Sequence, residues 1–222
     1  MFTKFVRKLQ TLNSAPVPFD PARYGDPLAT TTAWTPLKRG GANFRDYKLV
    51  KTSVYRLEFR ATAQAVLFYS VFLLGGLVPM IGITYSNISK GTLGLNADTI
   101  IPLVLGAIFA AVGGVMLYFE TIPVVFDRMR GCFWKGHGAP AVATGKAALK
   151  SYAEFSRIHA LQIISELCRG KKNSTYYSYE LNLVLDDGQR INVADHGNLQ
   201  KLREDAVTLS QFLGKPLWDA TS

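Results

Sequence analysis

Two stretches decide the fold: AVLFYSVFLLGGLVPMIGITY at residues 65–85 and TIIPLVLGAIFAAVGGVMLYF at residues 99–119. Each is 21 residues long and contains no Asp, Glu, Lys, Arg or His. An α-helix rises about 1.5 Å per residue, so each stretch would cover roughly 30 Å, the thickness of the hydrocarbon core of a bilayer. Both stretches therefore predict membrane-spanning helices. Two buried helices of a soluble protein are the less favoured interpretation.

The short connection at residues 86–98 makes the two predicted spans an antiparallel hairpin (residues 65–119). Residues 1–60 contain eleven Lys and Arg but only four Asp and Glu, whereas the connection contains only Lys90 and Asp98. Basic residues accumulate on the cytoplasmic side of a membrane. We therefore expect a multi-pass protein of the bacterial inner (plasma) membrane, with both termini in the cytoplasm.

Small residues recur along both predicted spans and let two helices approach closely. The residues predicted to pack are Gly75, Gly82, Gly106, Ala110 and Gly114. Packing within the hairpin is the favoured interpretation, and a seam between copies in a homo-oligomer is the alternative. Neither span contains an ionisable side chain, which argues against a transporter or proton pump but leaves an oligomeric pore open.

Residues 1–12 alternate apolar and basic side chains at helical spacing. They predict an amphipathic helix that lies on the membrane or docks on the protein. Residues 13–60 form a basic, proline-rich cytosolic segment that ends in short strands near 47–52 and 55–60. The basic residues predicted to contact lipid headgroups are Lys4, Arg7, Lys8, Arg56, Arg60, Arg128 and Arg130.

Residues 120–222 predict a cytosolic antiparallel β domain. Gly131 and Asp187-Gly188 indicate hairpin turns, and residues 157–167 favour a strand over a short helix. Asn198 is a good N-cap for an amphipathic helix at residues 199–213, which Gly214 and Pro216 would end. The predicted fold class is thus α+β: a transmembrane hairpin plus a β domain closed by a C-terminal helix.

No motif in the sequence predicts catalysis, a metal site or a cofactor. The three histidines and two cysteines show no CxxC or HExxH spacing, so Cys132 and Cys168 are interpreted as free thiols in or near the core. Asp195-His196 could form an acid–base pair, although a role in a turn is favoured. Residues 120–222 carry thirteen basic and eleven acidic residues, which is not the dense basic surface that nucleic acid requires.

Several short motifs after the second span resemble a known family. They are Phe126, Asp127, Gly131 and Phe133; Ile158, Ala160, Leu161 and Gln162; Leu202, Arg203 and Glu204; and Phe212, Leu213 and Pro216. Over residues 60–217 the chain resembles bacterial membrane-anchored pleckstrin-homology-like proteins, most closely the two-span photosystem I assembly factor family and its non-photosynthetic relatives. The resemblance implies a pleckstrin-homology-like β domain and a scaffold or assembly role, with no catalytic residues. The long amino-terminal extension departs from the family.

These observations predict a non-enzymatic membrane protein that presents its β domain to a protein or lipid partner. A small oligomeric channel or transport accessory is the alternative, as is an immunity-type protein that protects against a membrane toxin. An enzyme that uses Asp195 and His196 is a further class.

Overall fold

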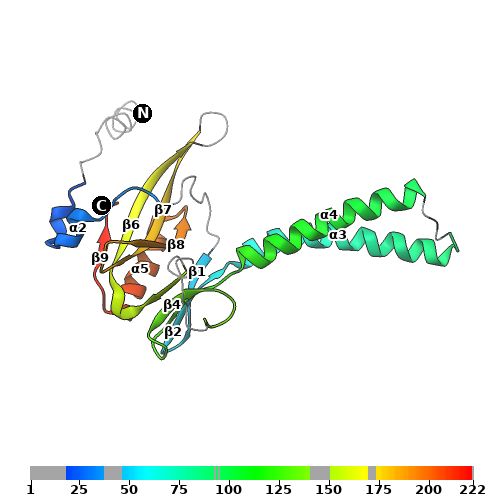
Figure 1. Ribbon diagram of the computed structural model, residues 1–222. Helices are drawn as coiled ribbons and strands as arrows, with labels where there is room; N and C mark the ends of the chain where they lie inside the picture. The colour runs from blue at the N-terminus through cyan, green and yellow to red at the C-terminus, as the bar shows by residue number, and fades with distance from the viewer. Residues whose placement is uncertain are drawn as a thin grey trace, which may run out of the picture.

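The computed structural model describes residues 19–37, 47–92, 94, 96–140, 151–169 and 174–221. It is an α+β structure with two largely antiparallel sheets and a pair of long helices that project from them (Figure 1). The elements are η1 (Pro21–Tyr24), α2 (Pro27–Thr31), β1 (Tyr47–Ser53), β2 (Arg56–Ala61), α3 (Ala63–Ser89), α4 (Ala97–Glu120), β3 (Val124–Asp127), β4 (Cys132–Lys135), β5 (Tyr152–Glu154), η3 (Phe155–Arg157), β6 (Ile158–Arg169), β7 (Thr175–Leu185), β8 (Arg190–His196), α5 (Leu199–Leu213) and β9 (Leu217–Asp219). The predicted amphipathic helix at residues 1–12 lies outside the described residues.

The first sheet has the order β1-β2-β3-β4-β5, and the helical hairpin is inserted between two of its neighbouring strands. β2 precedes α3, β3 follows α4, and the two strands pair antiparallel from Arg56–Asp127 to Phe59–Val124. The division of the sequence into a segment 13–60 and a separate β domain 120–222 therefore needs correction. Strands β1 and β2 belong to the β domain, because their hydrogen-bonding partners come after the hairpin.

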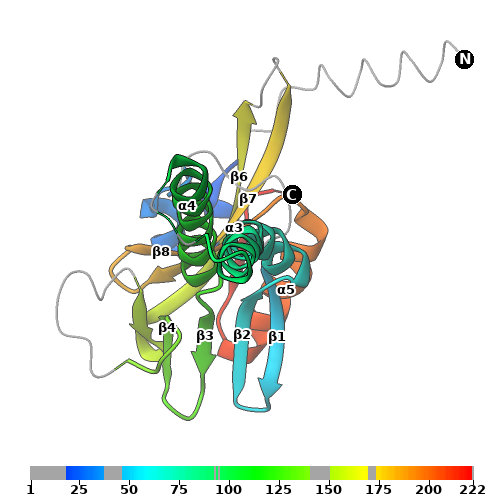
Figure 2. The same ribbon diagram turned by 90° about the vertical axis from the view of Figure 1, so that its right-hand side faces the viewer.

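The second sheet has the order β8-β7-β6-β9, with β9 parallel to β6 and the other pairs antiparallel. The apolar faces of the two sheets and of α5 form one core, because alternate residues of each strand point to the same side. Phe59, Phe126, Ile163, Leu183 and Leu202 are among its fully buried members. In Figure 2, which looks along the hairpin, α5 lies beside the strands β1 and β2.

The predicted turns and the C-terminal helix are confirmed. Gly131 and Gly188 have φ angles of 65° and 77°, a region that glycine adopts without strain, and each closes a hairpin. Asn198 Oδ1 accepts a hydrogen bond from the backbone N–H of Lys201 at 3.1 Å, and Gly214 ends α5 with φ 66°. Residues 158–169 form a strand, as the β-branched side chains indicated.

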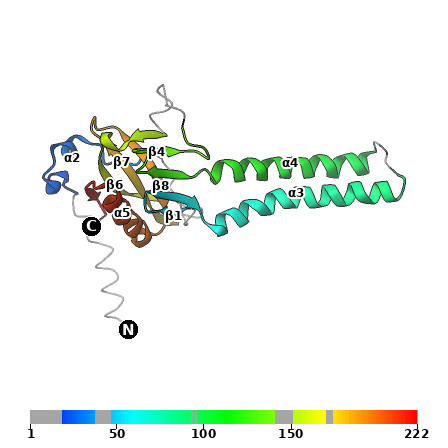
Figure 3. The ribbon, with the colours of Figure 1, turned by 90° about the horizontal axis from the view of Figure 1, so that it is seen from below.

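Helices α3 and α4 are both long and apolar enough to cross a membrane. They run side by side away from the sheets (Figure 3), and only 11% of the most apolar window of each helix is buried. A core helix of a soluble protein would be mostly buried. The exposed surface of this pair is therefore the kind of surface that lipid would cover.

The contact between α3 and α4 is made by glycines, although not by all of the predicted ones. A Cβ atom at Gly76 would collide with the backbone of Gly106 and Ala110, and one at Gly113 would collide with the backbone of α3 at Leu73. By contrast, a Cβ atom at Gly75 or Gly82 would meet nothing within 4 Å, and one at Gly114 would meet only Leu73 Cδ1, at 3.9 Å. The prediction of Gly75, Gly82 and Gly114 at this contact was wrong. Successive helical residues are turned by about 100°, so Gly76 and Gly113 face the partner helix where Gly75 and Gly114 do not, and Gly82 faces open space.

Candidate functional site

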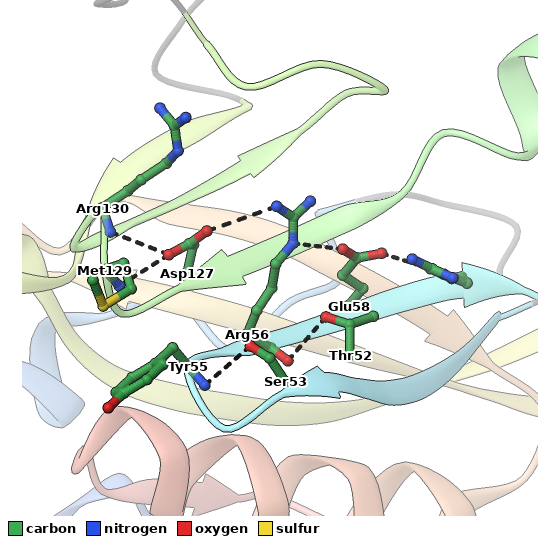
Figure 4. Close-up of polar contacts among 9 residues, drawn as sticks. Thr52, Ser53, Tyr55, Arg56, Glu58, Asp127, Met129 and Arg130 are labelled. Carbon is green, nitrogen blue, oxygen red and sulfur yellow. Dashed lines mark hydrogen bonds and ion pairs between the residues drawn. The ribbon is translucent and has the colours of Figure 1, made fainter.

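A row of alternating charges crosses the outer face of the five-stranded sheet (Figure 4). On β2, Glu58 lies between two arginines that share its face of the strand. Arg56 Nε donates to Glu58 Oε1 and Arg60 Nε donates to Glu58 Oε2, both at 2.6 Å. Glu58 is only 4% exposed, so the two guanidinium groups provide the charge partners that a buried carboxylate requires.

The row continues onto β3 through Asp127. Arg56 Nη1 lies 3.7 Å from Asp127 Oδ2, and Asp127 Oδ1 accepts the backbone N–H groups of Met129 and Arg130 at 2.9 and 3.1 Å. The guanidinium of Arg56 also lies over the ring of Trp134, 5.3 Å from its centroid. These contacts hold the β3–β4 turn against β2 and match two arginines with two carboxylates. The row is therefore a structural brace and not an open site for an anion.

Three of the arginines predicted to contact lipid headgroups lie far from the helices. β2 runs from Arg56 toward α3, and β3 runs from the end of α4 toward the turn that contains Arg128 and Arg130, so all three arginines are at the opposite end of the sheet. Arg128 is engaged there by α5: its Nε donates to the carbonyl oxygen of Phe212 at 2.9 Å, and its guanidinium lies 4.3 Å from the centre of the Phe212 ring. Headgroup contact by Arg56, Arg128 and Arg130 therefore stays a prediction, which their distance from the helices does not support. Lys4, Arg7 and Lys8 lie outside the described residues.

The end of the sheet that lies next to the helices carries Arg60 and Lys48, and the sequence had not indicated a role for Lys48. Lys48 on β1 is directly across from Arg60, and both side chains are exposed on the outer face. The neighbouring Tyr47 donates from its hydroxyl to the carbonyl oxygen of Glu120, at 2.8 Å, and so ties β1 to the end of α4. Like charges directly across a strand pair repel each other, and Glu58 offsets this repulsion because it accepts a hydrogen bond from Arg60. The alternation within residues 47–52 and within residues 55–60 could have indicated that Lys48 and Arg60 lie on the same face of the sheet.

The amino-terminal segment at residues 19–37 packs on the outer face of the four-stranded sheet. We call this segment the strap (Figure 1). Ala29 is fully buried in a cluster with Ala160, Val184 and Trp218. Trp34 Nε1 donates to the carbonyl oxygen of Ala29 at 2.9 Å, which folds the strap on itself. The sequence predicted only irregular chain here, whereas the structure makes the strap part of the domain.

Polar side chains beneath the strap fix its path. Gln162 Nε2 donates to the carbonyl oxygen of Ala33 at 3.1 Å, and Glu180 accepts the backbone N–H of Leu37. Burial raises the pKa of Glu180, which is 4% exposed and also accepts a hydrogen bond from Asn192. Each of these buried groups stabilises the strap by satisfying a backbone group that would otherwise lose its bond to water.

A hydrogen bond between His159 and Asp26 holds the first part of the strap. His159 Nε2 lies 2.7 Å from Asp26 Oδ2. The hydrogen bond from His159 lowers the pKa of Asp26. Asp26 Oδ1 also accepts the backbone N–H of Leu28 at 2.9 Å and so caps α2.

The structure does not bring Asp195 and His196 together as an acid–base pair. Asp195 Oδ1 accepts from Asn192 Nδ2 at 2.9 Å, whereas His196 Nδ1 accepts the backbone N–H of Asn198 at 2.8 Å, at the entry to α5. Cys132 and Cys168 are free thiols, both buried, and burial raises the pKa of each. Within the described ranges, no group of three His, Cys, Asp or Glu residues is arranged to hold a metal ion.

In the comparisons with known proteins, the chain matches no protein-family model and no curated protein.

Proposed function

We propose that this protein is a non-enzymatic membrane scaffold of the bacterial inner membrane. In this proposal α3 and α4 cross the bilayer, both termini are cytoplasmic, and the β domain is pleckstrin-homology-like and presents its surface to a protein or lipid partner. Two facing sheets closed by a C-terminal helix support the fold assignment. The excess of basic residues before α3 supports the orientation.

The observation that carries the proposal is the pairing of β2 with β3 across the helical hairpin. Only Thr62 separates β2 from α3, and only residues 121–123 separate α4 from β3. Both helices therefore continue directly into neighbouring strands of one sheet. A β domain rooted in this way has a fixed orientation on the membrane, which a scaffold needs and which a flexible linker would not provide.

Membrane retention and orientation test the proposal. The full chain should stay in the membrane fraction after a carbonate wash. A cysteine at Lys90, in the connection between the helices, should react with an impermeant maleimide on intact spheroplasts. A cysteine at Met129, which is 76% exposed on the β domain, should react only after lysis. The parent chain is the control for Cys132 and Cys168. A chain that stays dispersed in buffer without detergent, or two positions that react from the same side, would contradict the proposal.

An oligomeric channel is the second candidate, and one observation favours it. Gly75 and Gly82 lie seven residues apart on α3 with open space where a side chain would be. Helices of neighbouring copies could approach closely there. Crosslinking in native membranes separates the two candidates: adducts with a different protein support the scaffold, whereas adducts between copies alone support the channel.

A further inference from the structure

β6 and β7 extend well beyond the sheet to which they belong. They pair with each other as far as Arg169–Thr175, but β8 pairs with β7 no closer to the tip than Tyr179, and β9 pairs with β6 only at residues 161–163. Among the described residues, positions 166–169 and 175–178 thus form a two-stranded ribbon, which we call the arm. A two-stranded ribbon is only marginally stable in water by itself. The arm therefore gains from any surface that covers it.

The two faces of the arm differ sharply in exposure. One face is covered: Cys168 and Ser178 are buried, and Glu166 and Tyr176 are half-buried. On the other face every described side chain of the arm is exposed: Leu167, Arg169, Thr175 and Tyr177. Leu167 and Tyr177 are direct cross-strand partners and are 58% and 57% exposed. The Tyr177 ring stacks on Tyr179, with 6.5 Å between centroids, so the exposed patch continues the packing of the core.

The exposed face looks toward the side of the domain from which the helices leave. It lies on the same side of the strands as Leu161 and Ile163, which face the five-stranded sheet, and that sheet continues into α3 and α4. In Figure 1 the arm leans toward the helices as it rises. Figure 2 looks along the helices and shows the arm running outward beyond them, so that the helix pair does not cover it.

We propose that this face of the arm rests on the lipid headgroup layer of the membrane that α3 and α4 cross. The inference rests on the proposed function, because the hairpin must be inserted first. Tyrosine has an apolar ring with a polar end and is enriched at this depth of a membrane. Leu167 would enter the acyl boundary, and Arg169 would meet phosphate groups.

The membrane is favoured over another occupant because the chain itself holds it nearby. A hairpin that is already inserted gives the arm a high effective concentration of lipid, so a small patch of two side chains is sufficient for contact. A second copy that pairs with the edge of the arm would have to collide with it first. That arrangement is the competing outcome of the test.

A fluorescent probe that reports on lipid tests the inference. Single cysteines replace Tyr177, or Tyr55 as the matched control, which is a tyrosine 52% exposed in the β1–β2 turn at the far end of the domain. Each is labelled with an environment-sensitive fluorophore in the full chain and reconstituted in vesicles of phosphatidylcholine and phosphatidylglycerol. A spin label on the lipid headgroup should quench the probe at 177 by about half and leave the probe at 55 nearly unchanged, because only the former would lie at headgroup depth. Equal quenching at the two positions would overturn the inference.

A third position separates failure of this inference from failure of the proposed function. A probe at Val112 in α4, which is 47% exposed, should be quenched by a spin label on the acyl chain. If the probe at 112 is quenched and the probe at 177 is not, the hairpin is inserted and the arm does not touch the membrane. If the probe at 112 is not quenched, the proposed function fails first. Crosslinks between copies through position 177, without headgroup quenching, would assign the arm to a second copy and also overturn the inference.

Discussion

Glu180 accepts the backbone N–H of Leu37 with both carboxylate oxygens, at 2.9 and 3.2 Å, across 143 residues of sequence. This contact joins the end of the strap to the second strand of the four-stranded sheet. We expect Glu180→Ala to lower the free energy of unfolding by about 1–3 kcal/mol, because Asn192 and the N–H of Leu37 lose their acceptor. Trypsin should also cleave faster after Arg23, which is exposed in the strap. Denaturant unfolding and timed proteolysis measure the two effects.

The control for this prediction is Glu154→Ala, which removes an exposed glutamate from β5. A surface change of this kind should alter stability by less than about 0.5 kcal/mol. Equal proteolysis of the two variants would show that Glu180 does not hold the strap.

Glu180 should also give stability a dependence on pH. Burial raises the pKa of Glu180, so the folded chain binds this proton more tightly than the unfolded chain. The free energy of unfolding should therefore fall as the pH rises from 4.5, the ordinary pKa of a glutamate, through the raised pKa of Glu180. Above the raised pKa the loss of stability should be complete. Glu180→Gln should flatten this part of the profile. Denaturant unfolding across that range measures the slope, and parallel profiles for the two proteins would contradict the assignment.

The buried carboxylate of Glu58 should be essential to the charged row. Glu58→Ala leaves Arg56 and Arg60 without their shared acceptor. We expect the free energy of unfolding to fall by about 1–3 kcal/mol, measured by thermal unfolding of the detergent-solubilised chain. Arg130→Ala is the matched control, since its side chain is exposed and only its backbone N–H contacts Asp127. The prediction fails if the two variants melt together.

The helical hairpin should be far more sensitive at Gly76 than at Gly75. A valine at 76 would drive a Cβ atom into the backbone of Gly106 and Ala110, whereas a valine at 75 would enter open space. We expect Gly76→Val to destabilise the helix pair by about 1–3 kcal/mol through overpacking. The yield of a disulfide engineered between α3 and α4, measured in membranes, reports their separation. A lower yield for Gly75→Val than for Gly76→Val would reverse the assignment of the contact.

Local signals in the sequence predicted much of the fold. The uncharged stretches, the turns at Gly131 and Gly188, and the caps of α5 each depend on a few neighbouring residues, and the structure contains all of them. The pairing of β2 with β3 could not be predicted in the same way. The whole hairpin separates the two strands, and the residues of one strand do not show which distant strand it pairs with. The docking of the strap was missed for the same reason, because nothing in the sequence around Leu37 indicates that its backbone N–H binds Glu180.

The sequence did not show in which direction several of the predicted site residues lie. Alternation along β2 put Arg56 and Arg60 on one face correctly, but it could not show that Glu58 between them is buried and uses both guanidinium groups. Arg128 and Arg130 follow α4 closely in sequence, yet β3 carries them to the far end of the sheet. On α3 the predicted Gly75 is one residue away from Gly76, the glycine that contacts α4, and one residue is enough to turn a position away from the partner helix.

The insertion of the hairpin between β2 and β3 also dictates an order of events during biosynthesis. When the ribosome has made β1 and β2, the strand β3, which pairs with β2, has not yet been translated. It emerges only after both apolar helices, α3 and α4, have left the ribosome. Nascent chains should therefore keep the sheet open until α3 and α4 have been synthesised and, in the proposed topology, have entered the membrane.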